Sequence, residues 1–231
     1  MIHTSINALI GFQLTQFIKN KKLLSTSIII GIILPDIDLI LDFIISLFYN
    51  YNFLFQPLIS NSIFHSLLMI PFLSLLILIY LEYKNKNNPI IVIGLSIGML
   101  AHIIIDIISM DSVGIFFPLF DLNSNFSLNS YFNFQMSENF KKILFALDFF
   151  FFRLYTWMII NLILKKASDD NNIIKKLSIV MKLQLYIFLI FLLLIYFDAS
   201  ISLFSKLFGL LYTPCFFMAL LMTYKTRKII N

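Results

Sequence analysis

Long apolar stretches separated by short polar segments dominate this sequence. Five of them reach the length of about 20 residues that a helix needs to cross a bilayer: residues 23–47, 62–81, 89–109, 143–164 and 183–204. A sixth stretch, residues 207–224, is somewhat shorter, and residues 4–18 predict a short helix that packs in the bundle or lies at the membrane interface. The pattern therefore predicts an all-α fold, a polytopic transmembrane bundle of about six spanning helices plus a short N-terminal helix.

The composition agrees with a membrane environment. Apolar residues make up 60% of the 231 residues and charged residues only 13%, whereas about a quarter of a soluble domain is charged. A chain with so few polar residues could not cover its surface with groups that face water. The composition therefore excludes a soluble enzyme, a disordered tail and a nucleic-acid-binding domain. We expect one membrane-embedded domain over residues 1–231, with motifs in residues 1–120 and an outer loop and three supporting helices in residues 121–231. The lipid bilayer is the expected partner, and no nucleic acid is expected.

The basic residues indicate how the chain crosses the membrane. Most of the 17 lysines and arginines lie in short runs, at residues 19–22, 84–86, 165–182 and 225–228. Cytoplasmic connections carry an excess of Lys and Arg, and the six apolar stretches thread without conflict when these runs share one side. The net charge of +5 is then a topology signal. The sequence predicts an integral membrane protein with these runs on the cytoplasmic side.

A few ionisable residues interrupt the apolar stretches, where such residues are costly and usually functional. Pro35 breaks the helical hydrogen-bond ladder just before two aspartates, and His102 lies four residues from Asp106 on the same helix face. With the threading above, these residues and the other two histidines lie at similar depth on the outer side. Imidazole nitrogen and carboxylate oxygen together suit a divalent metal, with zinc favoured and manganese or iron as alternatives. The predicted ligands are His3, Asp36, Asp38, His65, His102 and Asp106.

Two carboxylates are candidates for a general base. Asp38 or Asp148 would take a proton from water if the metal does not fully engage it. The single cysteine, Cys215, excludes a thiolate cluster and an internal disulfide. The candidate chemistry therefore rests on histidine and aspartate.

The same residues carry a resemblance to a known family. The elements are His3 with Gly11, the run Gly-Ile-Ile-Leu-Pro-Asp-Ile-Asp at residues 31–38, His65 with Ser66, and His102 with Asp106, Gly114 and Pro118. In this order they resemble the YdjM-like family of inner-membrane-associated, metal-dependent hydrolases, over roughly residues 1–120. The family is distantly similar to the zinc-dependent phospholipase C and P1 nuclease group, which is an analogy of fold.

The chain departs from the family pattern at one place. The family commonly reads His-Arg-Gly-x-Thr-His-Ser, whereas residues 60–66 read Ser-Asn-Ser-Ile-Phe-His-Ser. Ser60 and Asn61 therefore replace a histidine and an arginine. A metal ligand or proton shuttle at that histidine, or a phosphate contact at that arginine, is missing here.

Three functions are compatible with the sequence. The first is a membrane-bound metal-dependent hydrolase that acts on a lipid or lipid-linked phosphoester. The second is an ion- or proton-coupled transporter, because intramembrane Asp and His residues also form relays. The third is a metal-stabilised membrane protein without catalysis.

Overall fold

The computed structural model describes residues 4–16, 23–49, 51–59, 63–86, 88–108, 114–117, 137–166 and 171–230. Within these residues all regular structure is helical, as the sequence predicts. The helices are α1 (Thr4–Gln16), α2 (Leu24–Ile33), α3 (Ile37–Phe48), α4 (Met69–Tyr83), α5 (Pro89–Ile108), α7 (Glu138–Lys166), α8 (Asn171–Tyr196), α9 (Ile201–Lys225) and α10 (Arg227–Ile230), and a 3-10 turn, η1 (Leu34–Asp36), joins α2 to α3.

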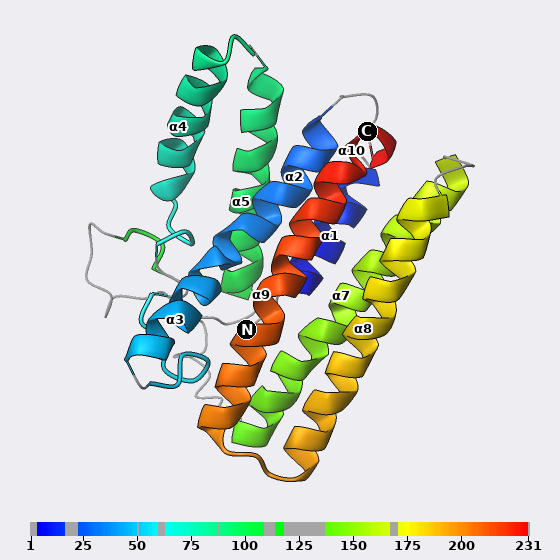
Figure 1. The fold of residues 1–231 in the computed structure, drawn as a ribbon. Coiled ribbons are helices and arrows are strands. Elements are labelled where there is room, and N and C mark those ends of the chain that lie inside the picture. Colours follow the sequence, from blue (N-terminus) through cyan, green and yellow to red (C-terminus); the bar gives the residue numbers. More distant parts are fainter. Residues whose placement is uncertain are drawn as a thin grey trace.

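Two helical hairpins flank a central group of helices. Helices α4 and α5 form one hairpin, α7 and α8 form the other, and α1, α2 and α9 lie between them (Figure 1). Helix α1 packs in the bundle against α2 and α7, which is the first of the two placements expected for it. The C-terminal ends of α4, α7 and α9 lie at the same end of the bundle (Figure 1). Because these ends carry Lys84, Lys165 and Lys225, the arrangement agrees with the threading derived from charge.

Four helices in the described part are long and apolar enough to cross a membrane: Pro89–Ile108, Glu138–Lys165, Asn172–Tyr196 and Ile201–Lys225. Helix α4 is apolar but shorter. The count of about six spans is therefore not confirmed by these residues. The first expected span is divided into α2 and α3, and the second begins later than the apolar pattern indicates.

The division of the first stretch follows from Pro35. Proline has no backbone N–H and its ring clashes with the preceding turn, so the α-helix cannot continue through it. The chain tightens into η1 and resumes as α3. Carbonyl groups in the last turn of α2 are thereby released from the helical ladder, and one of them, on Ile32, contacts the candidate site.

The expectation of a helix from residue 62 is wrong, because residues 63–68 form turns and α4 begins at Met69. Side-chain and backbone contacts with the segment after α5 compete with the helix here. The Ser66 hydroxyl donates to the carbonyls of Ile115 (3.1 Å) and Phe117 (2.7 Å), and the N–H of Leu67 donates to Ile115 (2.9 Å). The loop is thus tied down beside the end of α5.

The expected span at residues 183–204 is also placed wrongly, because a turn at residues 197–200 separates α8 from α9. Asp198 has a positive φ of 50°, a conformation that aspartate tolerates better than most residues. The Ser200 side chain caps the start of α9. Buried Lys142 donates to the carbonyl of Ala199 (3.0 Å) and pairs with Glu138 (2.7 Å). Asp198 and Ser200 are the two polar residues of this turn, and the apolar stretches on both sides of them predict one continuous helix.

Glycines allow α2 and α5 to approach closely. A Cβ atom at Gly98 of α5 would lie 2.7 Å from the backbone nitrogen of Ile32, and one at Gly31 would lie 2.8 Å from the Cα of Leu95. Real Cβ contacts are longer, so side chains at either position would force the backbones apart. The close contact brings the end of α5 against η1, which carries the predicted site residue Asp36 and leads into α3, which carries Asp38.

Gly98→Leu should therefore separate α2 from α5. Overpacking of this kind costs about 1–3 kcal/mol, so we expect a lower melting temperature for the detergent-solubilised protein. Ile97→Leu, at a neighbouring position that is 46% exposed, is the control and should melt like the wild type. Equal melting temperatures for both variants and the wild type would contradict the close-packing argument.

Candidate metal centre

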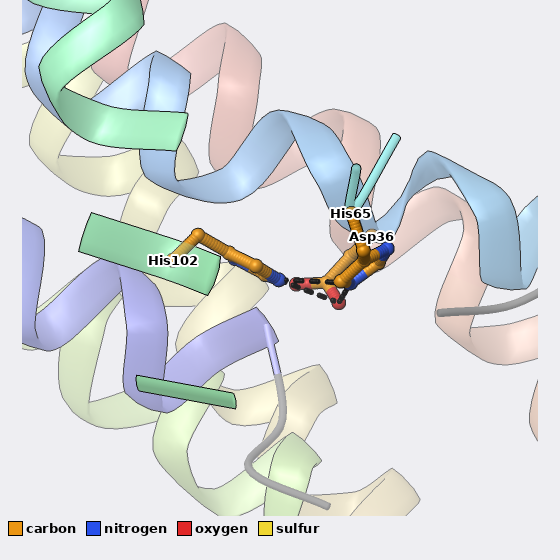
Figure 2. A group of neighbouring side chains, drawn as sticks. All are labelled: Asp36, His65 and His102. Carbon is orange, nitrogen blue, oxygen red and sulfur yellow. Dashed lines mark hydrogen bonds and ion pairs between the residues drawn. The ribbon is translucent and has the colours of Figure 1, made fainter. Parts of the chain in front are cut away.

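Three separate parts of the chain supply the candidate site. Asp36 ends the 3-10 turn η1, His65 lies in the loop before α4, and His102 and Asp106 lie one turn apart on α5. The side chains of Asp36, His65 and His102 point toward one another (Figure 2), and their ligand atoms all lie within 4.8 Å of one another. The break at Pro35 and the glycine contact between α2 and α5 together set this arrangement.

The centre of the site is formed by the Nε2 atoms of the two histidines, which lie 3.0 Å apart. One carboxylate oxygen of Asp106 lies 3.0 Å from Nε2 of His102 and 3.2 Å from Nε2 of His65. Oδ1 of Asp36 lies farther out, 3.7 Å from His102 and 4.0 Å from His65. Each of the two carboxylates thus offers an oxygen to the pair of Nε2 atoms.

The other nitrogen of each ring is held by a hydrogen-bond acceptor. Nδ1 of His65 donates to Asp38 (3.2 Å), and Nδ1 of His102 donates to the carbonyl of Ile32 (2.6 Å). These bonds fix the orientation of both rings and, in the neutral form, leave a lone pair on each Nε2 atom. Metal-binding histidines almost always have this kind of outer hydrogen bond.

The arrangement fits a bound cation. Two lone pairs facing each other at 3.0 Å beside carboxylates are stable only when a proton or a metal ion sits among them. Bond lengths of 2.0–2.1 Å to zinc place neighbouring ligands about 2.9–3.4 Å apart in octahedral or tetrahedral geometry. The three separations among His65, His102 and Asp106 fall within that range. The residues therefore fit a divalent metal, with Asp36 able to complete the ligand set.

Burial strengthens this conclusion. His65, His102 and Asp106 are at most 3% exposed, and Asp38 is fully buried. Carboxylates in an apolar interior are strongly unfavourable unless a cation or hydrogen bonds compensate for them. A divalent ion at the meeting point would supply this compensation.

The predicted site residues have different outcomes. The structure brings Asp36, His65, His102 and Asp106 together, whereas Asp38 lies on the far side of the His65 ring. Asp38 also accepts from the N–H of Phe64 (3.0 Å), so it holds the His65 loop. His3 lies outside the described residues.

Asp148, the other candidate base, lies on α7. Its Oδ1 accepts from the backbone N–H of Ser5 (3.1 Å) and from the Ser5 hydroxyl at the start of α1. The contact anchors the N-terminal turn of α1 beside the site. Its role as a base, like that of Asp38, stays a prediction.

Several contacts at the site were missed in the sequence. The Asn7 side-chain amide lies 3.0 Å from Nδ1 of His102, and the Thr4 hydroxyl contacts the Tyr212 hydroxyl of α9. The polar positions 4, 5 and 7 in an apolar helix were a signal for this face of α1. Nothing in the sequence marks the Ile32 carbonyl as a contact of the site. This backbone group becomes available to His102 only because the helix is interrupted at Pro35.

Asp42 supports a neighbouring loop. It is buried, and its carboxylate accepts from the Tyr51 hydroxyl (3.0 Å) and from the N–H groups of Leu58 (3.3 Å) and Ile59 (3.0 Å). Desolvation, and then the nearby negative charge of Asp42, raise the pKa of Tyr51. Asp42 therefore stabilises the connection between α3 and the His65 loop.

A comparison with known protein families identifies the same family as the sequence motifs. The family model for YdjM inner membrane protein matches residues 1–202. The chain belongs to the YdjM inner membrane protein family. This YdjM family member is accordingly an integral inner-membrane protein, in agreement with its four long apolar helices. The match extends through α7 and α8, beyond the first 120 residues that carry the motifs. No curated protein and no solved structure matched the chain.

Asp38→Asn should weaken metal binding by this YdjM family member. A neutral amide holds the His65 ring less firmly than a carboxylate, and such outer contacts are typically worth about 10–100-fold in metal affinity. Competition for Zn²⁺ with a chromophoric chelator measures this change in detergent-purified protein. Glu82→Gln, an exposed carboxylate of α4, is the control. Equal zinc affinities in the two variants would show that Asp38 does not support His65 as a ligand.

Proposed function

We propose that this protein is a membrane-embedded, metal-dependent hydrolase whose substrate is a lipid or lipid-linked phosphoester. The observation that carries the proposal is the convergence of the two histidine Nε2 atoms with carboxylate oxygens of Asp106 and Asp36. A divalent ion bound there supplies Lewis acidity to a phosphoryl oxygen and acidifies water. The apolar helices around the site favour a substrate that is itself dissolved in the membrane.

The protein groups around the metal ligands have separate tasks. The Ile32 carbonyl and Asp38 orient the two imidazole rings, and Asn7 borders the His102 ring. Asp36 is the ligand most open to a substrate, since its side chain is 14% exposed while the histidines are buried. We assign proton transfer from water to Asp38 or Asp148, the carboxylates that lie beside the ligand group.

The replacement of the family's His-Arg pair by Ser60 and Asn61 bears on the substrate. Arginine commonly grips phosphate in a bidentate manner. Without it, substrate binding depends more on the metal and on lipid contacts. We therefore expect weaker discrimination among phosphate headgroups than the family pattern implies.

The membrane topology belongs to the same proposal. We propose that α2, η1 and α3 together form one crossing and that α4 forms another, which gives six with the four long helices. Residues 24–48 would span about 37 Å at 1.5 Å per residue. The basic ends of the helices then face the cytoplasm.

A second candidate function is a metal-stabilised membrane protein without catalysis. Its support is the burial of His65, His102 and Asp106, which leaves little room for a substrate at the metal itself. The two candidates share the metal centre and differ in turnover. Metal content and hydrolysis must therefore be measured on the same samples.

We expect detergent-purified wild-type protein to retain a divalent ion, and His102→Ala and the His65→Ala/His102→Ala double variant to lose it. Elemental analysis by mass spectrometry measures the metal. Hydrolysis of lipid phosphomonoesters, phosphodiesters and diphosphates in mixed micelles should occur with the wild type, stop on chelation and fail in both variants. Asp198→Asn, in the exposed α8–α9 turn, is the control for both measurements.

The outcomes separate the two candidates. A full metal complement in the double variant would overturn the metal centre. Metal that is lost in the variants, with no hydrolysis of any lipid class by the wild type, would favour the non-catalytic candidate.

A further inference from the structure

A second group of buried polar atoms lies beside the metal centre. It is built from the start of α1, η1, α7 and α9. The Thr4 hydroxyl contacts the Tyr212 hydroxyl and lies next to the Asp36 carboxylate. Asp148 reaches the same turn of α1 from α7, because its Oδ1 accepts from the backbone N–H of Ser5 (3.1 Å), the residue next to Thr4. Thr4, Asp148 and Tyr212 are all at most 2% exposed.

Two carboxylate oxygens in this group have no hydrogen-bond partner within the described part of the chain. They are Oδ2 of Asp36 and Oδ2 of Asp148, and both atoms are buried. Each belongs to a carboxylate whose other oxygen is already engaged: Oδ1 of Asp36 by the two histidines, and Oδ1 of Asp148 by Ser5. A buried acceptor without a donor costs about 1–3 kcal/mol, and more when it is charged.

The number of negative charges around the site also favours an additional cation. Four buried or nearly buried carboxylates surround the site: Asp36, Asp38, Asp106 and Asp148. Among the described residues, no ion pair joins Asp36, Asp38 or Asp148 to a lysine or arginine. One divalent ion offsets two of the four negative charges. Because an apolar interior strongly disfavours net charge, the other two charges must be neutralised by protons or by a second divalent ion.

We infer that Asp36 bridges the metal centre to a second cation site, completed by Asp148, Tyr212 and Thr4. The inference rests on the proposed function, because Asp36 belongs to both sites. The first site offers nitrogen and oxygen ligands, whereas the second offers only oxygen. Oxygen donors select hard cations such as Mg²⁺ and Mn²⁺, so the two sites should hold different metals.

Electron paramagnetic resonance of Mn²⁺ tests this inference. Metal-free protein in detergent is first loaded with one equivalent of Zn²⁺, so that zinc fills the histidine site and leaves the oxygen site free. It is then titrated with Mn²⁺, and the free Mn²⁺ signal reports the fraction bound. We expect the wild type to bind one Mn²⁺ per chain without releasing Zn²⁺. Asp148→Asn should weaken Mn²⁺ binding by at least about tenfold, since it removes a direct ligand and outer contacts alone are worth that much. Zinc content should not change.

Matched variants keep the result decisive. Asp198→Asn makes the same chemical change at an exposed carboxylate and should bind Mn²⁺ like the wild type. Tyr212→Phe keeps the aromatic ring and removes only the hydroxyl, so it should weaken Mn²⁺ binding even if Asp148→Asn does not fold. Melting temperatures identify any variant that is unfolded.

The failures of the two proposals are distinguishable. Zinc-loaded wild type that binds no Mn²⁺, or an affinity for Mn²⁺ that is unchanged in both Asp148→Asn and Tyr212→Phe, would overturn the second site and leave the first intact. Wild type that binds no Zn²⁺ would overturn the proposed function, and Mn²⁺ binding lost in Asp148→Asn would still support the oxygen site.

Discussion

The meeting of two imidazole nitrogens 3.0 Å apart, beside the carboxylates of Asp106 and Asp36, is the constraint on which the interior of this protein depends. Acceptor atoms at such distances repel one another unless a cation lies among them. In an apolar interior no water is at hand to weaken that repulsion. A cation held at this place would stabilise the fold and is the basis of the proposed chemistry.

The local structure around the site serves this convergence. Pro35 ends α2 early, which presents the Ile32 carbonyl to His102 and turns Asp36 toward the histidines. Gly31 and Gly98 let α2 and α5 pack backbone against backbone. Ser66 ties the His65 loop to the segment after α5. Each of these contacts lies away from the ligand atoms, yet each determines where a ligand lies.

The polar atoms beside the histidines extend the site toward α7 and α9. Ser5 and Thr4 place the first turn of α1 against Asp148 and Tyr212. A helix that begins among buried carboxylates and hydroxyls is unusual in an apolar bundle, because each such group must find a partner. This arrangement links the motif-bearing region to the helices that follow it. It agrees with a family match that continues to residue 202.

The amino-acid sequence by itself determined the all-helical membrane class and the residues that could carry chemistry. Apolar length and the isolation of His65, His102 and Asp106 in apolar surroundings are local properties, so they can be read without a structure. Helix ends could not be read in the same way, because the turn at residues 197–200 and the loop at residues 63–68 place only two polar residues each within longer apolar stretches. Only the tertiary structure separated the four candidate ligands, Asp36, His65, His102 and Asp106, from Asp38, which contacts the other nitrogen of His65. This distinction depends on which nitrogen of the His65 ring faces α3 and which faces α5. Packing between segments far apart in the chain decides the orientation of the ring.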